Sequence, residues 1–272
     1  MLNNSQYSSS KKYEARIYLS RNFKTNPESK YEWIFDHFPT NNNLHILELG
    51  CGTGLFWLAN RNSIKKSWSI ILSDYSEGMI ETTRKYLSML DFNFQFEVIN
   101  AENIQYPDNT FDIILANNML YHIQNRDTAV SKISRILKDT GVFIASTMGR
   151  DDLFELHNHL YTFLESKNNN FKFRELAFSL DNGIEQLTNY FEKVDLEKYD
   201  NKLEITEIDA IVNYYLSFNG IYDNVVVLPE EYKNDFKIYL QDILDKEKTI
   251  TTTKDEGMFI CKKPKMMQHL CQ

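Results

Sequence analysis

Short apolar runs alternate with helical patterns along the middle of the chain. The apolar runs, each short enough for a buried strand, lie at residues 44–49, 68–72, 94–99, 111–116 and 142–146. Between two of them Met79, Ile80 and Leu87 recur at helical spacing, and residues 129–137 repeat that pattern. Strands separated by helices of this length predict an α/β fold, with a doubly wound parallel sheet that carries helices on both faces.

The pattern also predicts four parts along the chain. Residues 1–43 are polar with helical patches and form an N-terminal helical cap, and residues 44–150 hold the strand–helix repeats. Residues 151–190 combine helix and loop in a helical insertion. The strand pattern resumes in residues 191–272, where Gly257–Cys261 is the last strand candidate.

Composition narrows the choice of partners. The chain has 30 Lys and Arg against 38 Asp and Glu, a formal net charge of −8, which disfavours nucleic acid and anionic membrane surfaces. No run approaches the roughly 20 apolar residues of a membrane helix, and the start lacks the apolar segment of a secretory signal. Cys51, Cys261 and Cys271 lack the spacing of zinc ligands. We expect a cytoplasmic protein with no metal site.

The sharpest chemical feature is the segment ELGCGTG at residues 48–54, directly after a strand and before a helix. Its glycines allow a tight turn and let a ligand approach bare backbone amides at a helix N-terminus. The next strand ends at Asp74, which faces the same crevice in a doubly wound sheet. A carboxylate there accepts both hydroxyls of a ribose, so the pair predicts a nucleoside-containing cofactor.

The spacing of the glycines limits which cofactor this is. A dinucleotide fingerprint requires a third glycine where this chain has Leu55, and no G-K-[ST] follows the loop as a P-loop requires. Pyrophosphate and nucleoside triphosphate binding are therefore disfavoured.

Taken together, these motifs resemble the class I S-adenosylmethionine-dependent methyltransferases, in the small-molecule branch that includes the ubiquinone/menaquinone-biosynthesis type. The resemblance is strong over residues 44–148 and is carried by LELGCGTG at 47–54, DYSEGM at 74–79, NAEN at 100–103 and FDII at 111–114. It implies a mostly parallel, seven-stranded, Rossmann-like sheet whose last strand, Gly257–Lys262, is antiparallel.

The resemblance also implies roles for the residues of the glycine loop. Gly50, Cys51, Gly52 and Gly54 would pass under the methionine part of S-adenosylmethionine, and of its product S-adenosylhomocysteine. Glu48 would hold the amino end of the cofactor, directly or through water.

Further along, the resemblance assigns the nucleoside. Asp74 would bind the ribose hydroxyls, and Tyr75 or Met79 would pack on the adenine. Ala101 and Glu102 would meet the adenine edge. Met79 is equally well explained as a core residue of its own helix, because methionine at helical spacing usually fills a core.

Three more residues complete the predicted site. The backbone near Asn117 would line the sulfonium side, and His122, just after the fourth strand, is a candidate general base for an oxygen or nitrogen nucleophile. His122 can instead have a structural role in its loop. Arg16 either closes over the cofactor from the N-terminal helix or only packs there.

The substrate is less closely defined. The sequence NNML at 117–120 replaces the [DN]-P-P-[YFW] signature of methyltransferases that act on adenine or glutamine amino groups. The aromatic-rich insertion at 151–190 suits a lid over a small, partly apolar metabolite, methylated at O, N or C by in-line displacement. Two alternatives stay open: a protein or tRNA substrate, and a catalytically silent scaffold that binds the cofactor. The protein is expected to be a monomer or a homodimer.

Overall fold

The computed structural model describes residues 10–220 and 226–265, which form two compact units that alternate along the chain. Of the described residues, the first unit, here called the sheet unit, comprises 28–149, 176–199 and 256–265. The second, the helical unit, comprises 10–27, 150–175, 200–220 and 226–255. The predicted insertion at 151–190 is therefore shared between the two units, and the four-part division of the chain stays a prediction.

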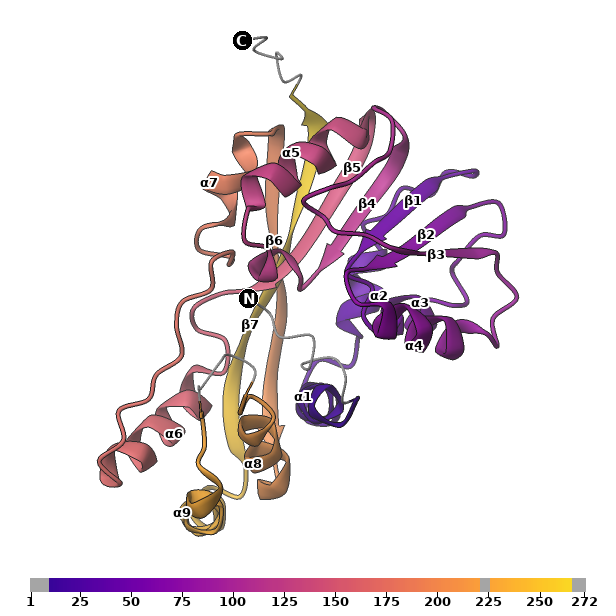
Figure 1. Cartoon of the computed structure of the whole chain (residues 1–272). Helices are drawn as coiled ribbons and strands as arrows, with labels where there is room; N and C mark the ends of the chain where they lie inside the picture. Colours follow the sequence, from indigo (N-terminus) through magenta and orange to yellow (C-terminus); the bar gives the residue numbers. More distant parts are fainter. Residues whose placement is uncertain (1–9, 221–225, 266–272) are drawn as a thin grey trace. The chain divides into compact units, whose positions relative to one another are not determined.

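The fold is a seven-stranded mixed sheet, which confirms the predicted class (Figure 1). Its strands are β1 (His45–Leu49), β2 (Ser69–Asp74), β3 (Phe94–Val98), β4 (Phe111–Asn117), β5 (Leu137–Met148), β6 (Phe191–Ile205) and β7 (Ile250–Pro264). Their order is β3-β2-β1-β4-β5-β7-β6. The first five strands pair in parallel, and β7 pairs antiparallel with β5. Strands β6 and β7 contribute residues to both units.

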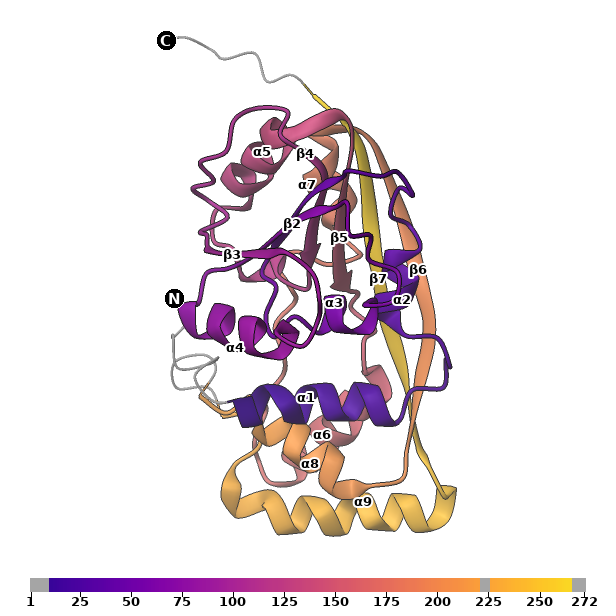
Figure 2. The ribbon, with the colours of Figure 1, turned by 90° about the vertical axis from the view of Figure 1, so that its right-hand side faces the viewer.

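Helices flank the strands of the sheet unit on both faces (Figure 2), and side chains that alternate along the strands build a core on each face. Ile113 packs on the face covered by α2 (Lys30–Phe35), α3 (Leu55–Ala59) and α4 (Glu77–Leu87). Its neighbour Ile114 packs on the face covered by α5 (Arg126–Ile136) and α7 (Gly183–Thr188). This inward-and-outward alternation is the strand period of two, with both faces buried.

Capping explains where two helices depart from their predicted bounds. Helix α5 starts at Arg126, earlier than expected, because the Asn125 side chain accepts the backbone N–H of Thr128 at 3.0 Å. The segment after the glycine loop predicts a helix over residues 55–62. Helix α3 ends earlier, at Ala59, and the amide of the next residue, Asn60, donates to the Phe56 carbonyl at 2.8 Å.

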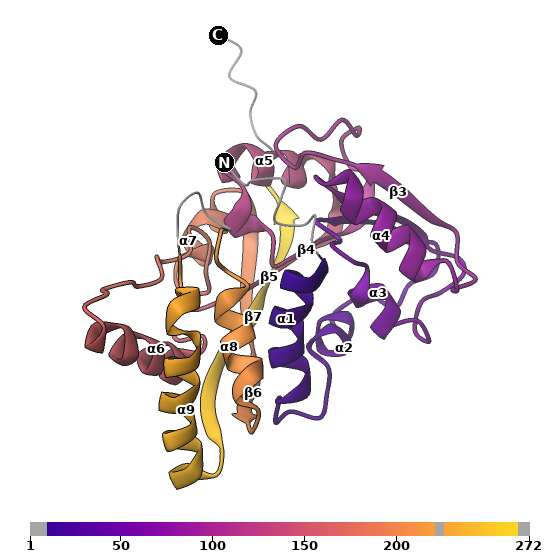
Figure 3. The same ribbon diagram turned by 60° about the horizontal axis from the view of Figure 1, so that its bottom comes forward.

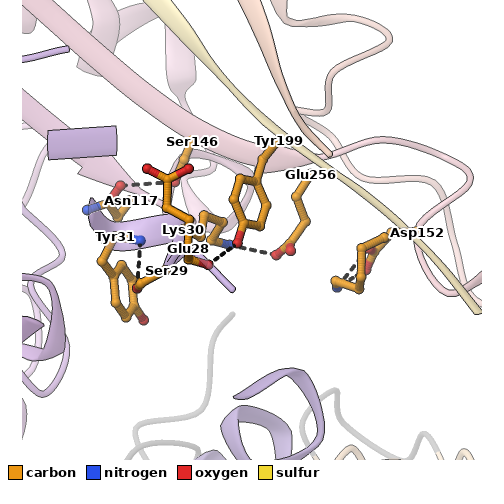
Figure 4. Close-up of polar contacts among 10 residues, drawn as sticks. Glu28, Ser29, Lys30, Tyr31, Asn117, Ser146, Asp152, Tyr199 and Glu256 are labelled. Carbon is orange, nitrogen blue, oxygen red and sulfur yellow. Dashed lines mark hydrogen bonds and ion pairs between the residues drawn. The ribbon is translucent and has the colours of Figure 1, made fainter. Parts of the chain in front are cut away.

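The start of α2 is tied to strands β6 and β7 within the sheet unit (Figure 4). Ser29 caps the helix, and the next residue, Lys30, forms a 2.6 Å ion pair with Glu256 of β7. The Tyr199 hydroxyl of β6 donates to the Glu28 carbonyl at 2.6 Å. These contacts hold α2 on the face of the sheet that it covers together with α3 and α4.

The helical unit has its own core, built by α1 (Ser10–Asn22), α6 (Phe154–Ser166), α8 (Ile208–Leu216) and α9 (Lys233–Glu247). Helix α8 packs against both α1 and α9 (Figure 3). Among residues 10–220 and 226–265, no helix has the length and apolar character needed to cross a bilayer. Cys51 and Cys261 are buried thiols, and Cys271 lies outside the described residues.

Candidate functional site

The glycine loop between β1 and α3 needs its glycines for conformation and for space. Gly50, Gly52 and Gly54 have φ of 72°, 56° and 76°, in the left-handed region that side chains disfavour. A Cβ on Gly50 would lie 2.9 Å from Cβ of Met119, and one on Gly54 would lie 2.8 Å from Cγ2 of Thr83. Only glycine therefore fits these positions without rearrangement.

Asp74, at the end of β2, fastens this loop. Its Oδ2 accepts the backbone N–H of Gly52 at 3.0 Å, and its Oδ1 accepts the N–H of Ser76 at 2.9 Å. Burial raises the pKa of Asp74, while these N–H donors act in the opposite direction. Each oxygen retains a second lone pair, so the carboxylate can still accept hydrogen bonds from a ligand.

Glu48, near the end of β1, is a second carboxylate in the same site, and its side chain is only 1% exposed. Its Oε2 accepts the indole N–H of Trp57 at 2.6 Å, and its Oε1 accepts from Nδ2 of Asn117 at 3.3 Å. The Ser146 hydroxyl on β5 donates to Oδ1 of Asn117 at 3.0 Å (Figure 4). This hydrogen bond leaves the amide nitrogen of Asn117 to donate to Glu48. Burial raises the pKa of Glu48 to about 7, against the two hydrogen bonds that lower it, and the nearby Asp74 charge adds to the rise.

Cys51 helps to hold the shape of the loop: its side chain is part of the core beneath the loop, and its backbone is hydrogen-bonded within the protein. The Cys51 N–H donates to the Ser73 carbonyl at 2.8 Å, and its sulfur lies 3.6 Å from the Thr83 hydroxyl. That hydroxyl donates to the Gly52 carbonyl at 2.6 Å. Burial raises the pKa of the Cys51 thiol, so the group stays neutral and apolar.

The residues expected around the adenine differ in exposure. Tyr75 follows Asp74 and is 67% exposed, whereas Met79 is buried in α4 and Ala101 is buried in the core on the α5 face. Oε1 of Glu102 accepts the backbone N–H of Asn125 at 3.1 Å. It lines a polar surface hollow of about 450 Å³ together with Gln124, Asn125, Arg126, Asp127 and Gln186. Of the predicted adenine contacts, Tyr75 is the aromatic one, and its ring is exposed.

His122 and Arg16 lie in different units. His122 ends a short 3₁₀ helix (Leu120–His122) after β4, and its ring lies 4.4 Å from that of Tyr121. Arg16 belongs to the helical unit, where its guanidinium lies 3.4 Å from the Ser217 hydroxyl and 5.3 Å from the Phe218 ring centre. The proposed base role of His122 and the cofactor contact of Arg16 stay predictions.

Two polar atoms around the loop are suited to a ligand. Within the described part of the chain, the Thr53 hydroxyl and Oδ1 of Asn118 are buried and have no hydrogen-bond partner. Buried polar atoms normally find partners, and a bound group can supply them. Together with a glycine cradle and two carboxylates, these atoms fit a nucleoside that carries a cationic amino acid end.

Sequence reasoning missed three residues of this site: Trp57, Thr83 and Ser146. Each reaches the site from a neighbouring element, and each contact depends on how that element packs. The paired register of β4 and β5, which sets Asn117 opposite Ser146, is one example. No local motif marks such residues.

Comparison with known proteins gives consistent results. The methyltransferase-domain family matches residues 40–272. A ubiquinone/menaquinone biosynthesis C-methyltransferase from Hydrogenovibrio crunogenus is 34% identical over 98 residues, 35% of this chain and 39% of that protein. A malonyl-[acyl-carrier protein] O-methyltransferase from Ilyobacter polytropus is 31% identical over 162 residues, 59% of this chain and 55% of that protein. The matched part of the chain thus spans about half, or less, of these relatives' length.

The fold comparison agrees. The crystal structure of a putative methyltransferase from Bacillus halodurans superposes with a TM-score of 0.56 at 15% identity, covering 88% of this chain and 100% of that one. Such a likeness shows the fold alone, whereas the family match extends over most of the sequence. The chain belongs to the methyltransferase-domain family, whose class I members take S-adenosylmethionine as methyl donor.

Proposed function

We propose that the protein is a methyltransferase that moves a methyl group from S-adenosylmethionine to an O, N or C nucleophile of a small, partly apolar metabolite. One observation carries the proposal. A glycine loop with three left-handed glycines is fastened by Asp74, and a second, buried carboxylate, Glu48, stands beside it. Family membership supports the same reaction.

The roles of the chain's residues follow from their chemistry. The ionised Glu48 carboxylate attracts the cationic amino end of the cofactor, in a buried setting where such an attraction is strong. The second lone pairs of Asp74 accept the ribose hydroxyls. The exposed ring of Tyr75 supplies a face for the adenine.

When bound, S-adenosylmethionine supplies a methyl carbon activated by the sulfonium that leaves. The protein therefore has to bind and orient two molecules, and alignment alone accounts for much of the acceleration in such reactions. His122 follows the strand that ends at Asn117, and we assign to it the removal of a proton from an oxygen or nitrogen nucleophile. A carboxylate nucleophile is already ionised at neutral pH and needs no base, whereas methylation of a ring carbon still releases the proton of that carbon.

The names of the relatives bear on the acceptor atom, and aromatic contacts in the helical unit support a partly apolar acceptor. The two relatives are named for a quinone-biosynthesis C-methylation and for O-methylation of a malonyl group on its carrier, so the family accommodates differing acceptor atoms. In the helical unit, Phe173 stacks on His157 at 4.7 Å and packs edge-on against Phe218 at 5.5 Å. Aromatic side chains of this kind are common in sites for apolar ligands.

Calorimetric titration with S-adenosylhomocysteine tests cofactor binding. We expect one site per chain in the wild type. Asp74→Ala should weaken binding about 100-fold or more, because it removes an acceptor for two hydroxyls at about 1.5–3 kcal/mol each. Asp91→Ala, at a fully exposed carboxylate, is the matched control. Undiminished binding by Asp74→Ala would refute the assignment of the site.

Turnover tests the second half of the proposal. The protein is incubated with S-adenosylmethionine and a panel of acceptors: hydroxylated aromatic rings, short acyl carboxylates, a transfer RNA and a peptide mixture. Release of S-adenosylhomocysteine is measured for each. We expect release with a small-molecule acceptor. Release only with RNA or peptides would show that the proposed substrate class is wrong, and the proposed methyl transfer would still hold.

A further inference from the structure

Trp57 forms a buried hydrogen bond with one of the two carboxylates of the candidate site. Its indole N–H donates to Oε2 of Glu48 at 2.6 Å, and both side chains are almost wholly buried. Hydrogen bonds to an ionised acceptor in a buried site are among the stronger ones in proteins. The contact therefore bears on the charge and the orientation of Glu48.

The surroundings of Trp57 hold its ring in one position. It lies in the short helix α3, directly after the glycine loop, and its ring meets those of Phe38, Phe56 and Phe94 edge-on at 6.4, 5.3 and 6.0 Å. Edge-on aromatic pairs have a preferred geometry, which restricts the rotation of the indole. The donor is thus fixed before any ligand binds.

The two oxygens of Glu48 have different partners. Trp57 donates to Oε2, whereas Oε1 has, among the residues that the structure describes, the longer contact to Asn117 at 3.3 Å. One oxygen is accordingly held by the protein, and the other has the weaker partner and the capacity to accept from a ligand.

We propose that Trp57 is a positioning residue: its indole N–H holds the Glu48 carboxylate in one orientation and in its charged form, ready for the cationic amino end of the cofactor. This inference rests on the proposed function. It assigns to this chain a coupling between proton release from Glu48 and cofactor binding.

The charges that face Glu48 set the direction of the effect. Burial is the largest influence and raises the pKa of Glu48 to about 7; the Trp57 and Asn117 hydrogen bonds oppose it, and the charge of Asp74 from β2 adds to it. Cys51 faces the carboxylate from the loop, and its own raised pKa keeps it neutral. Loss of the indole N–H should raise the pKa of Glu48 further, leaving it mostly protonated at neutral pH.

The first test uses the wild-type protein. Its three tryptophans give separate indole N–H resonances in a ¹⁵N correlation spectrum. We expect the Trp57 resonance to shift with a midpoint near pH 7 and to move again when S-adenosylhomocysteine is added. Trp68, whose indole donates to the Asn41 carbonyl at 2.9 Å, is the internal control. A Trp57 resonance that stays constant from pH 5.5 to 8.5 would overturn the proposal.

The second test measures S-adenosylhomocysteine affinity between pH 6 and 9. Wild-type affinity should rise with pH as Glu48 loses its proton. Trp57→Phe should move that rise up by about one to two pH units and lower the affinity at pH 7 about 5- to 50-fold. Trp68→Phe removes a comparable indole hydrogen bond from the same core and should leave the midpoint unchanged. Glu48→Gln should flatten the profile.

The outcomes separate this inference from the proposed function. If the wild type binds S-adenosylhomocysteine and Trp57→Phe has the wild-type midpoint, Trp57 is structural only and the inference is wrong. If the wild type does not bind at any pH, the proposed function fails, and the resonance titration still decides whether Trp57 senses Glu48. Should Trp57→Phe fold poorly, benzothienylalanine at position 57 keeps the bicyclic ring and lacks the N–H.

Discussion

Oδ2 of Asp74 accepts the backbone N–H of Gly52 at 3.0 Å, which joins the end of β2 to the middle of the glycine loop. The residue expected to bind ribose thus also shapes the loop expected to pass under the rest of the cofactor. A change at Asp74 should therefore affect both halves of the site, which makes this pair the first to test.

Asp74→Asn separates the shape of the residue from its charge. The amide retains one acceptor oxygen, so either the Gly52 or the Ser76 N–H loses its partner. We expect amide hydrogen exchange over residues 50–54 to accelerate about tenfold, the loss of roughly one hydrogen bond, with weaker binding of S-adenosylhomocysteine. Hydrogen-exchange mass spectrometry measures the first effect. Asp91→Asn serves as control, and unchanged exchange would show that the loop holds its shape without this bond.

Gly54→Ala and Gly78→Ala should have opposite effects on stability. At Gly54 the left-handed φ and a Cβ position 2.8 Å from Cγ2 of Thr83 should together cost about 2–4 kcal/mol. Gly78 lies in α4, where the nearest atom to an added Cβ is 3.8 Å away, and alanine there should stabilise by about 0.4–1 kcal/mol. Denaturant unfolding of both variants provides the test. Equal losses would contradict the strain assigned to the loop.

His122→Ala tests the proposed general base. If His122 accepts the proton of the nucleophile, kcat should fall about 100-fold or more, and binding of S-adenosylhomocysteine should be unchanged. The matched control is His45→Ala. His45 lies at the start of β1, and the glycine loop follows the other end of that strand, so the control removes a histidine away from the loop. A wild-type rate and pH profile in His122→Ala would assign the histidine a structural role.

His157 should make the stability of the helical unit depend on pH. Its Nδ1 lies 3.0 Å from the Tyr215 hydroxyl, and burial lowers its pKa from 6.5 to about 4, with the charge of Lys254 adding to the fall. The unfolded chain binds a proton near pH 6.5 and the folded one does not, so stability is lost as pH falls below 6.5. Relative to His157→Gln, the wild type should lose about 2 kcal/mol between pH 7 and pH 5. Unfolding curves at both pH values decide, and a constant difference would contradict the prediction.

The loop and its acid could be found from sequence because each is marked locally. Glycines follow a strand, and Asp74 closes the next one, so both features depend only on neighbouring residues. The Trp57–Glu48 hydrogen bond could not be found from sequence. Several aromatic residues are near Trp57 in the sequence, and any of their rings could have faced the carboxylate. Which one does is decided by the length of α3 and the packing of its neighbours.

Strand β7 shows a second reason why part of the fold could not be predicted from the sequence. It begins at Ile250, well before the predicted Gly257. Residues 251–256 are polar, so hydrophobicity does not predict a strand there, although several of them are buried. Lys254 forms a 2.7 Å ion pair with Asp152, and Glu256 pairs with Lys30. Buried charges are tolerated when they are paired. Partners so distant along the chain cannot be recognised from hydrophobic alternation.

The interleaving of the units also affects experimental design. The aromatic-rich stretch predicted as an insertion, residues 151–190, includes Phe178, which packs on Phe259 in the core of the sheet unit. Removing the whole stretch would therefore damage the cofactor site's own sheet. Single substitutions in α6 are the better probe of its contribution to acceptor binding.

The antiparallel pairing of β5 with β7 has a consequence for biosynthesis. Val142 is paired with Lys262, so one edge of β5 stays without its partner strand until the residues between them have been translated. At roughly 5–20 residues per second, this delay is on the order of ten seconds, long compared with the folding of a strand–helix unit. During that interval the nascent chain exposes an apolar strand edge from the middle of its future sheet. We expect chaperone dependence to be greatest at this stage of synthesis.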